Sequence, residues 1–186
     1  VGLLLTNGIP VYGMPDAFVK EFGRALWFGL PTTVYVALAL IAVVWFIQTR
    51  TKLGRYIFAI GGNLQAATVS GVPATAYLVL TYVMCSVLAS VAGILMTARL
   101  GSGQATMGGN VMMLQSIAAA VIAGVSLRGG IGRVEMVALG ALFLSILTNA
   151  MNLLRIDSKM QVVVLGVIIV LAVALDELGK RRQIRD

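Results

Sequence analysis

Long apolar segments alternate with short polar segments along most of the chain. The apolar segments are continuous rather than alternating in hydrophobicity, and each is too long for a typical strand, which favours helices. A helix needs about 20 residues to cross about 30 Å of hydrocarbon. The pattern therefore predicts an all-α membrane protein, a polytopic transmembrane helix bundle with about five spans in a single transmembrane domain, 1–186. The expected spans are 30–47, 74–98, 111–125, 134–154 and 160–175.

The composition agrees with a membrane protein. Of the 186 residues, 59% are hydrophobic and 11% are charged, whereas a soluble domain carries roughly 25% charged residues. The formal net charge is +7, which in a soluble protein could indicate nucleic-acid binding. Here the cations lie at the ends of apolar segments, where they act as orientation signals. We therefore expect contact with membrane lipid and no nucleic-acid partner.

The distribution of Lys and Arg predicts the orientation. If all five segments cross, the cation-rich side carries Arg50, Lys52, Arg55, Arg128, Arg133, Lys180, Arg181, Arg182 and Arg185. The other side carries Lys20, Arg24, Arg99, Arg155 and Lys159. Because the richer side is normally cytoplasmic, we expect a periplasmic loop at 1–29, with a short amphipathic helix near 17–26, a cytoplasmic loop at 48–73 and a cytoplasmic tail at 176–186. A re-entrant 111–125 segment would weaken this bias.

The polar segment 51–73 separates two spans and contains no carboxylate. Asn63 is a good N-cap, Gly71 suits the left-handed position after a last turn, and Pro73 prevents continuation. We predict a short helix over 63–71, with a sharp bend allowed by Gly61–Gly62. Small residues would let another surface approach this helix: Ala66, Ala67 and Ser70. The segment is either an ordinary connection or a docking helix for a soluble partner.

The side chains that carry chemistry are few. No acidic residue lies deep in a span, which argues against ion coupling, and the chain has no histidine. No phosphate-binding loop or activated nucleophile is present, so we predict no enzymatic activity, no catalytic or metal-binding residue and no cofactor. Neutral amides and hydroxyls suit a neutral, hydroxyl-rich solute, although they could also join neighbouring helices. The candidates for a solute path are Gln104, Asn110, Gln115, Ser116, Asn149 and Asn152.

Two motifs resemble the permease subunits of bacterial ABC importers for simple sugars, the ribose-type group. The first has the pattern T-x-x-G-R-x-x-x-A-x-G-x-N-x-x-A-A-x-x-S-G, matched from Thr51 to Gly71. The second is matched by Ala98–Leu100, Ile117–Ala119, Gly124, Ser126–Leu127, Gly129–Gly130 and Gly132–Arg133. The similarity covers nearly the whole chain.

The resemblance implies that 1–186 is the C-terminal half of a permease in the bacterial inner membrane. It implies a cytoplasmic coupling helix that carries motion from a separate ABC ATPase subunit into the spans. Further implied partners are a periplasmic sugar-binding protein and a second permease copy. The expected coupling residues are Gly54, Arg55, Ala59, Gly61, Asn63, Ala66, Ala67, Ser70 and Gly71. An ion-gradient-driven carrier and a structural membrane subunit are the alternative functions.

Overall fold

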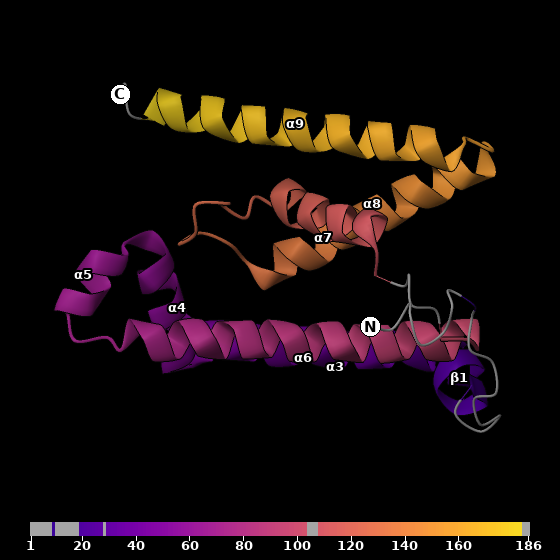
Figure 1. Ribbon diagram of the computed structural model, residues 1–186, viewed down its shortest axis with the longest axis horizontal. Helices are drawn as coiled ribbons and strands as arrows, with labels where there is room; N and C mark the ends of the chain where they lie inside the picture. Colours follow the sequence, from indigo (N-terminus) through magenta and orange to yellow (C-terminus); the bar gives the residue numbers. More distant parts are fainter. Residues whose placement is uncertain (1–8, 10–18, 28, 104–107, 184–186) are drawn as a thin grey trace.

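The computed structural model describes residues 9, 19–27, 29–103 and 108–183. Within these ranges the chain is mostly helical (Figure 1). The first elements are a π-helix, η1 (Val19–Arg24), and a short antiparallel ribbon of β1 (Leu26–Trp27) and β2 (Leu30–Pro31). The expected helix near 17–26 is thus confirmed over Val19–Arg24, while residues 17 and 18 lie outside the described part of the chain.

In the described part of the chain, three helices are long and apolar enough to cross a membrane: α3 (Thr32–Arg50), α6 (Ala74–Leu100) and α8 (Val134–Leu153). Two further helices follow the other predicted apolar segments. They are α7 (Asn110–Ile122) and α9 (Ser158–Gln183). All five predicted apolar segments are therefore helical, with ends that differ by a few residues from those expected.

Two of these helices differ most from the expected segments. Helix α9 continues through the polar segment that we expected to be a tail, because Glu, Leu, Lys, Arg and Gln all favour helix. Residues 184–186 of that tail lie outside the described residues. At 13 residues, α7 is shorter than the predicted segment; at 1.5 Å per residue it spans only about 20 Å.

The helices form two layers. Figure 1 shows α3 and α6 along one long side, α9 along the other, and α7 and α8 between them. The first layer consists of η1 and α3 to α6, and the second layer consists of α7 to α9, as the contacts between elements indicate. Buried Ala118, Ala119, Leu144 and Leu165 form the core of the second layer. There Gly140 lets α7 and α8 approach closely, because a Cβ on Gly140 would lie 2.5 Å from the Ala119 carbonyl oxygen.

The largest difference from the sequence prediction lies between α3 and α6. We expected an irregular segment before the short helix, but Lys52–Gly62 forms an 11-residue helix, α4. Thr51 caps it, with its hydroxyl accepting from the Gly54 N–H at 3.4 Å. Apolar residues recur on one face of α4 at a spacing of three or four: Leu53, Tyr56, Ile57 and Ile60. That periodicity is typical of an amphipathic helix. It favours a helix here although α4 contains glycines, which disfavour one.

Candidate functional site

The predicted short helix is present as α5 (Leu64–Val69). The side-chain oxygen of Asn63 accepts from the Ala66 N–H at 3.0 Å, so Asn63 is the expected N-cap. Gly71 has a φ of +81°, as a left-handed position after the helix requires. The bend between α4 and α5 lies at Asn63, with φ −157° and ψ 103°, whereas Gly61 and Gly62 are part of α4. The prediction of a glycine bend was therefore wrong.

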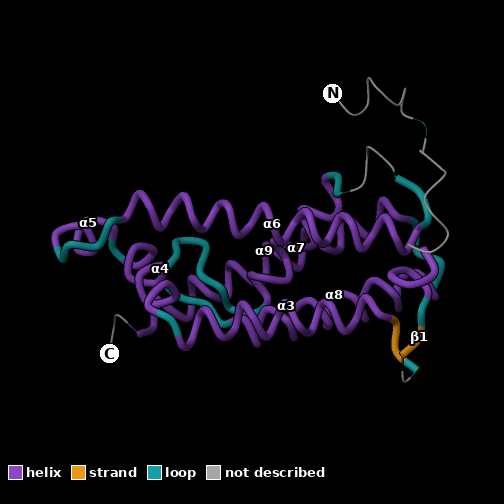
Figure 2. Tube along the Cα trace, turned by 90° about the horizontal axis from the view of Figure 1, so that it is seen from below, coloured by secondary structure: helices purple, strands orange, loops and turns teal. Residues whose placement is uncertain are grey.

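One face of α5 packs against α4 and α6, and the other face is exposed. Ala67, 5% exposed, packs with Ile60 of α4 and Ala74 of α6. Ala67 therefore holds α5 in place and is not available to an approaching surface, contrary to our expectation. The exposed residues of α5 include Ala66 and Val69, which is 89% exposed. At the left end of Figures 1 and 2, α5 projects beyond α3 and α6.

The other predicted coupling residues fall into two groups. Gly54 is buried where α4 crosses the end of α3. The backbones lie so close at this point that a Cβ on Gly54 would collide with the Gln48 backbone. Gly61 faces the loop that joins α7 to α8. In contrast, the exposed members of the predicted set are Arg55, Ala59, Asn63, Ala66, Ser70 and Gly71. The motif thus contains residues that position α4 and α5 and residues that remain accessible.

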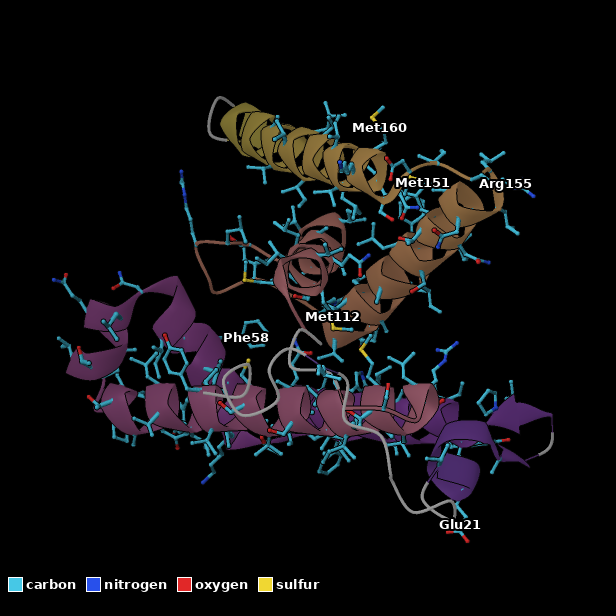
Figure 3. All side chains as sticks on the ribbon, turned by 45° about the vertical axis from the view of Figure 1, so that its right-hand side comes forward. Glu21, Phe58, Met112, Met151, Arg155 and Met160 are labelled. Carbon is cyan, nitrogen blue, oxygen red and sulfur yellow. The ribbon has the colours of Figure 1, made fainter. Side chains whose placement is uncertain are left out.

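Four of the six predicted solute-path residues line one cavity of about 410 Å³ between α7 and α8. Gln115 and Ser116 come from α7, and Asn149 and Asn152 come from α8. Met112 of α7, labelled in Figure 3, also lines this cavity. The volume lies within the range of roughly 300–1,000 Å³ that is usual for small-molecule sites. Gln104 lies outside the described residues, as does the side chain of Asn110.

The polar groups of this cavity differ in their partners. The amide Oδ1 of Asn152 accepts from Nε2 of Gln161 at 2.8 Å, and the Ser116 hydroxyl donates to the Met113 carbonyl at 2.8 Å. The side-chain amides of Gln115 and Asn149 make no hydrogen bond to any other described residue. These two amides therefore have donors and acceptors available for a ligand.

The sequence reasoning missed two further polar residues of the cavity, Ser145 and Thr148. With Asn149 and Asn152 they recur at a spacing of three or four along α8, which places them on one helical face. That stripe is visible in the sequence as a polar face on an otherwise apolar span, and it could have been recognised there.

Gln48 was also missed. Its Nε2 donates to the Gly132 carbonyl at 2.8 Å, and its Oε1 accepts from the Val134 N–H at 3.0 Å. One turn earlier, the Trp45 indole donates to the Glu135 carboxylate at 2.5 Å. These bonds join the end of α3 to the start of α8. A single amide at the end of a span carries no local signal of such a contact.

Comparison with known proteins identifies one matching family model and several relatives. Residues 5–173 match the family model described as the branched-chain amino acid transport system permease component. The chain is 40% identical over 182 residues to the ribose import permease protein RbsC of Escherichia coli (strain K12), covering 95% of this chain and 56% of that protein. It is 35% identical over 178 residues to the D-allose transport system permease protein AlsC, covering 96% of this chain and 54% of that protein from the same strain.

A third relative is the L-arabinose transport system permease protein AraH of the same strain. The identity is 37% over 175 residues, covering 93% of this chain and 52% of that protein. The chain thus spans about half the length of the curated relatives that it matches. No solved structure matches it.

Proposed function

The chain belongs to the family of branched-chain amino acid transport system permease components, and from that premise we propose that it forms part of the membrane-crossing subunit of an ATP-driven ABC importer for a simple sugar or a sugar-like solute. Relatives of this all-α membrane protein are named as permeases for ribose, allose and arabinose. The permease itself hydrolyses no ATP in this proposal; a separate ABC ATPase subunit does so. A periplasmic sugar-binding protein delivers the solute, and a second permease copy completes the pathway.

The observation that carries the proposal is the cavity between α7 and α8. Its polar lining consists of amides and hydroxyls, and none of the described residues that line it is charged. Amides both donate and accept hydrogen bonds, which matches the hydroxyl groups of a neutral sugar. A carrier for an amino acid or another ion would need a charged or strongly polarised partner for each charged group of its substrate. Gln115 and Asn149 are the groups that contact the solute in this proposal.

The exposed face of α5 supports the coupling step. Ala67 fixes α5 to α4 and α6, so a force applied at Ala66 or Val69 moves all three helices rather than bending a loop. We assign this face to contact with the ATPase subunit. The predicted coupling residues that are buried, Gly54 and Ala67, hold the helix in the geometry that the contact needs.

The arrangement of helix ends supports the orientation. The α4–α5 segment, the loop joining α7 to α8 and the C-terminal end of α9 lie toward the same end of the molecule (Figure 1). We propose that this end is cytoplasmic and that all five apolar helices cross the bacterial inner membrane, the short α7 with help from its flanking residues. Residues 48–73 are then a cytoplasmic coupling segment, 176–186 end in the cytoplasm, and 1–29 are periplasmic.

Reconstitution tests this proposal. The full-length permease, the ATPase and the binding protein are placed in proteoliposomes, and uptake of radiolabelled ribose, allose and arabinose is measured. We expect uptake of at least one sugar that requires ATP and the binding protein. Uptake driven by an ion gradient without nucleotide would identify a secondary carrier instead. No uptake of any sugar by a correctly assembled complex would favour a structural membrane subunit.

A further inference from the structure

The two layers of the molecule are connected chiefly at one end. Among the helix pairs with substantial contact, only α3 and α8 join the first layer to the second within the described residues. The loop between α7 and α8 lies beside α4 at the same end (Figure 2). Any motion that passes from α4 and α5 to the solute cavity must therefore cross this end of the molecule.

Gln48 makes a two-bond contact across that boundary. It sits in the last turn of α3, and its amide holds both the Gly132 carbonyl and the Val134 N–H. The first N–H groups of a helix have no partner within the helix. The N-cap residue of α8, Arg133, makes no side-chain cap bond. Gln48 therefore supplies from another helix a hydrogen bond that the start of α8 needs.

A direct backbone contact lies next to this amide. A Cβ on Gly61 would lie 2.6 Å from the Gly130 nitrogen, and a Cβ on Gly130 would lie 2.7 Å from the Gly62 Cα. A Cβ on Gly129 would similarly lie 2.7 Å from the Gly61 carbonyl oxygen. The end of α4 and the loop before α8 thus touch backbone to backbone, with no flexible side chain between them. The two sequence motifs meet at this contact.

An apolar cavity adjoins this contact. It has a volume of about 510 Å³ and lies among α3, α4, α6, the start of α8 and the loop, and Phe58 of α4, labelled in Figure 3, is in its wall. Its rim includes Gln48, Gly61, Gly129, Gly130 and Gly132. Displacement of α4 therefore reaches α8 by the glycine contact and by α3, which Gln48 and Trp45 join to α8.

We propose that the Gln48 amide and the Gly61–Gly130 contact form a relay that transmits displacement of α4 and α5 to α8. This proposal rests on the proposed function. Helix α8 is continuous from Val134 to Leu153, so a shift of its first turn is carried along the rod to Asn149 and Asn152 in the solute cavity. Gln48 is a positioning residue in this scheme: it touches neither solute nor nucleotide and acts by holding α8 to α3.

The test is the number of solute molecules imported per ATP hydrolysed by the assembled transporter. Gln48→Met keeps the length of the side chain and removes both hydrogen bonds, so we expect this ratio to fall about tenfold. Gln48→Glu keeps the acceptor for the Val134 N–H, and we expect a smaller fall. Thr49→Val is the matched control, because its hydroxyl bonds only to Trp45 of its own helix. ATPase binding and ATP hydrolysis should stay at the wild-type level in all three variants.

A second pair of variants tests the relay if Gln48→Met fails to assemble. Gly130→Ala places a methyl group against Gly62, whereas Gly124→Ala introduces the same kind of backbone strain, at φ +77°, with no heavy atom within 4 Å. We expect only Gly130→Ala to lower the ratio. A wild-type ratio in Gln48→Met or in Gly130→Ala, or loss of ATPase binding together with uptake, would overturn the relay. If the wild-type complex imports no solute with ATP, the proposed function itself fails.

Discussion

The side chain of Asn63 caps the helix that begins one residue later, with its Oδ1 accepting from the Ala66 N–H at 3.0 Å. This bond is local, but α5 has only six residues. A helix that short is not stable on its own in water. Its persistence therefore depends on the cap, on the turn at Gly71 and on the packing of Ala67, and each can be tested separately.

Loss of the cap should loosen α5. Replacing an Asn cap by Ala costs about 1 kcal/mol, so we expect Asn63→Ala to raise the hydrogen-exchange rate of the Ala66 and Ala67 amides about fivefold. Asn63→Asp retains an acceptor and should leave the exchange near the wild-type rate. Hydrogen exchange with mass spectrometry on the purified permease measures both variants. Equal protection in Asn63→Ala and wild type would show that the cap does not hold α5.

The turn after α5 needs glycine. Gly71 has a φ of +81°, which costs a non-glycine residue roughly 1–2 kcal/mol and is worst for β-branched side chains. We expect Gly71→Val to abolish uptake while the permease still inserts at normal levels. Gly62→Ala is the control, because Gly62 has an ordinary φ and a Cβ added to it would meet no heavy atom within 4 Å. Uptake by the two variants is compared at equal expression, and normal uptake by Gly71→Val would contradict the prediction.

The close crossing of α7 and α8 should tolerate no side chain at Gly140. A Cβ there would lie 2.5 Å from a backbone carbonyl, which cannot rotate away as a side chain could. Overpacking of this kind typically costs about 1–3 kcal/mol, so we expect Gly140→Ala to lower the thermal unfolding midpoint of the permease in detergent. Gly93→Ala, on a helix with open space at that position, should leave the midpoint unchanged. Similar midpoints for the two variants would contradict the close packing.

The solute cavity makes contrasting predictions for two amides. The side-chain amide of Gln115 makes no hydrogen bond to another described residue, so Gln115→Ala should weaken uptake without lowering thermal stability. Asn152 is bonded to Gln161, and Asn152→Ala should cost about 1 kcal/mol of stability in addition to any loss of uptake. Uptake curves and thermal midpoints of the two variants are measured side by side. An unchanged uptake curve for Gln115→Ala would remove Gln115 from the solute path.

The sequence predicted the features that depend on neighbouring residues. The cap at Asn63, the left-handed turn at Gly71 and the apolar helices all follow from local chemistry and periodicity, and the structure confirms them. Helix α4 was also locally encoded, since Leu53, Tyr56, Ile57 and Ile60 form an apolar face. It was missed because Gly61–Gly62 was interpreted as a bend before the short helix.

The features that depend on distant residues were not predictable in the same way. Gly61 is needed for its approach to Gly130, not for a bend, and nothing near Gly61 in the sequence distinguishes these two roles. Gln48 and Val134 are 86 residues apart. The sequence likewise did not show which face of α5 is buried, because the burial of Ala67 depends on Ile60 and Ala74.

Site-directed crosslinking of α5 tests whether this helix contacts the ATPase subunit. Val69, 89% exposed, is replaced by Cys in a Cys85→Ser background, and the assembled transporter is treated with a short thiol-to-amine crosslinker during ATP turnover. We predict a crosslink between the Val69→Cys variant and the ATPase subunit, and a much weaker one for Ala67→Cys, because Ala67 is buried. Labelling of the Val69→Cys thiol from the periplasmic side, or no crosslink to the ATPase during turnover, would contradict it.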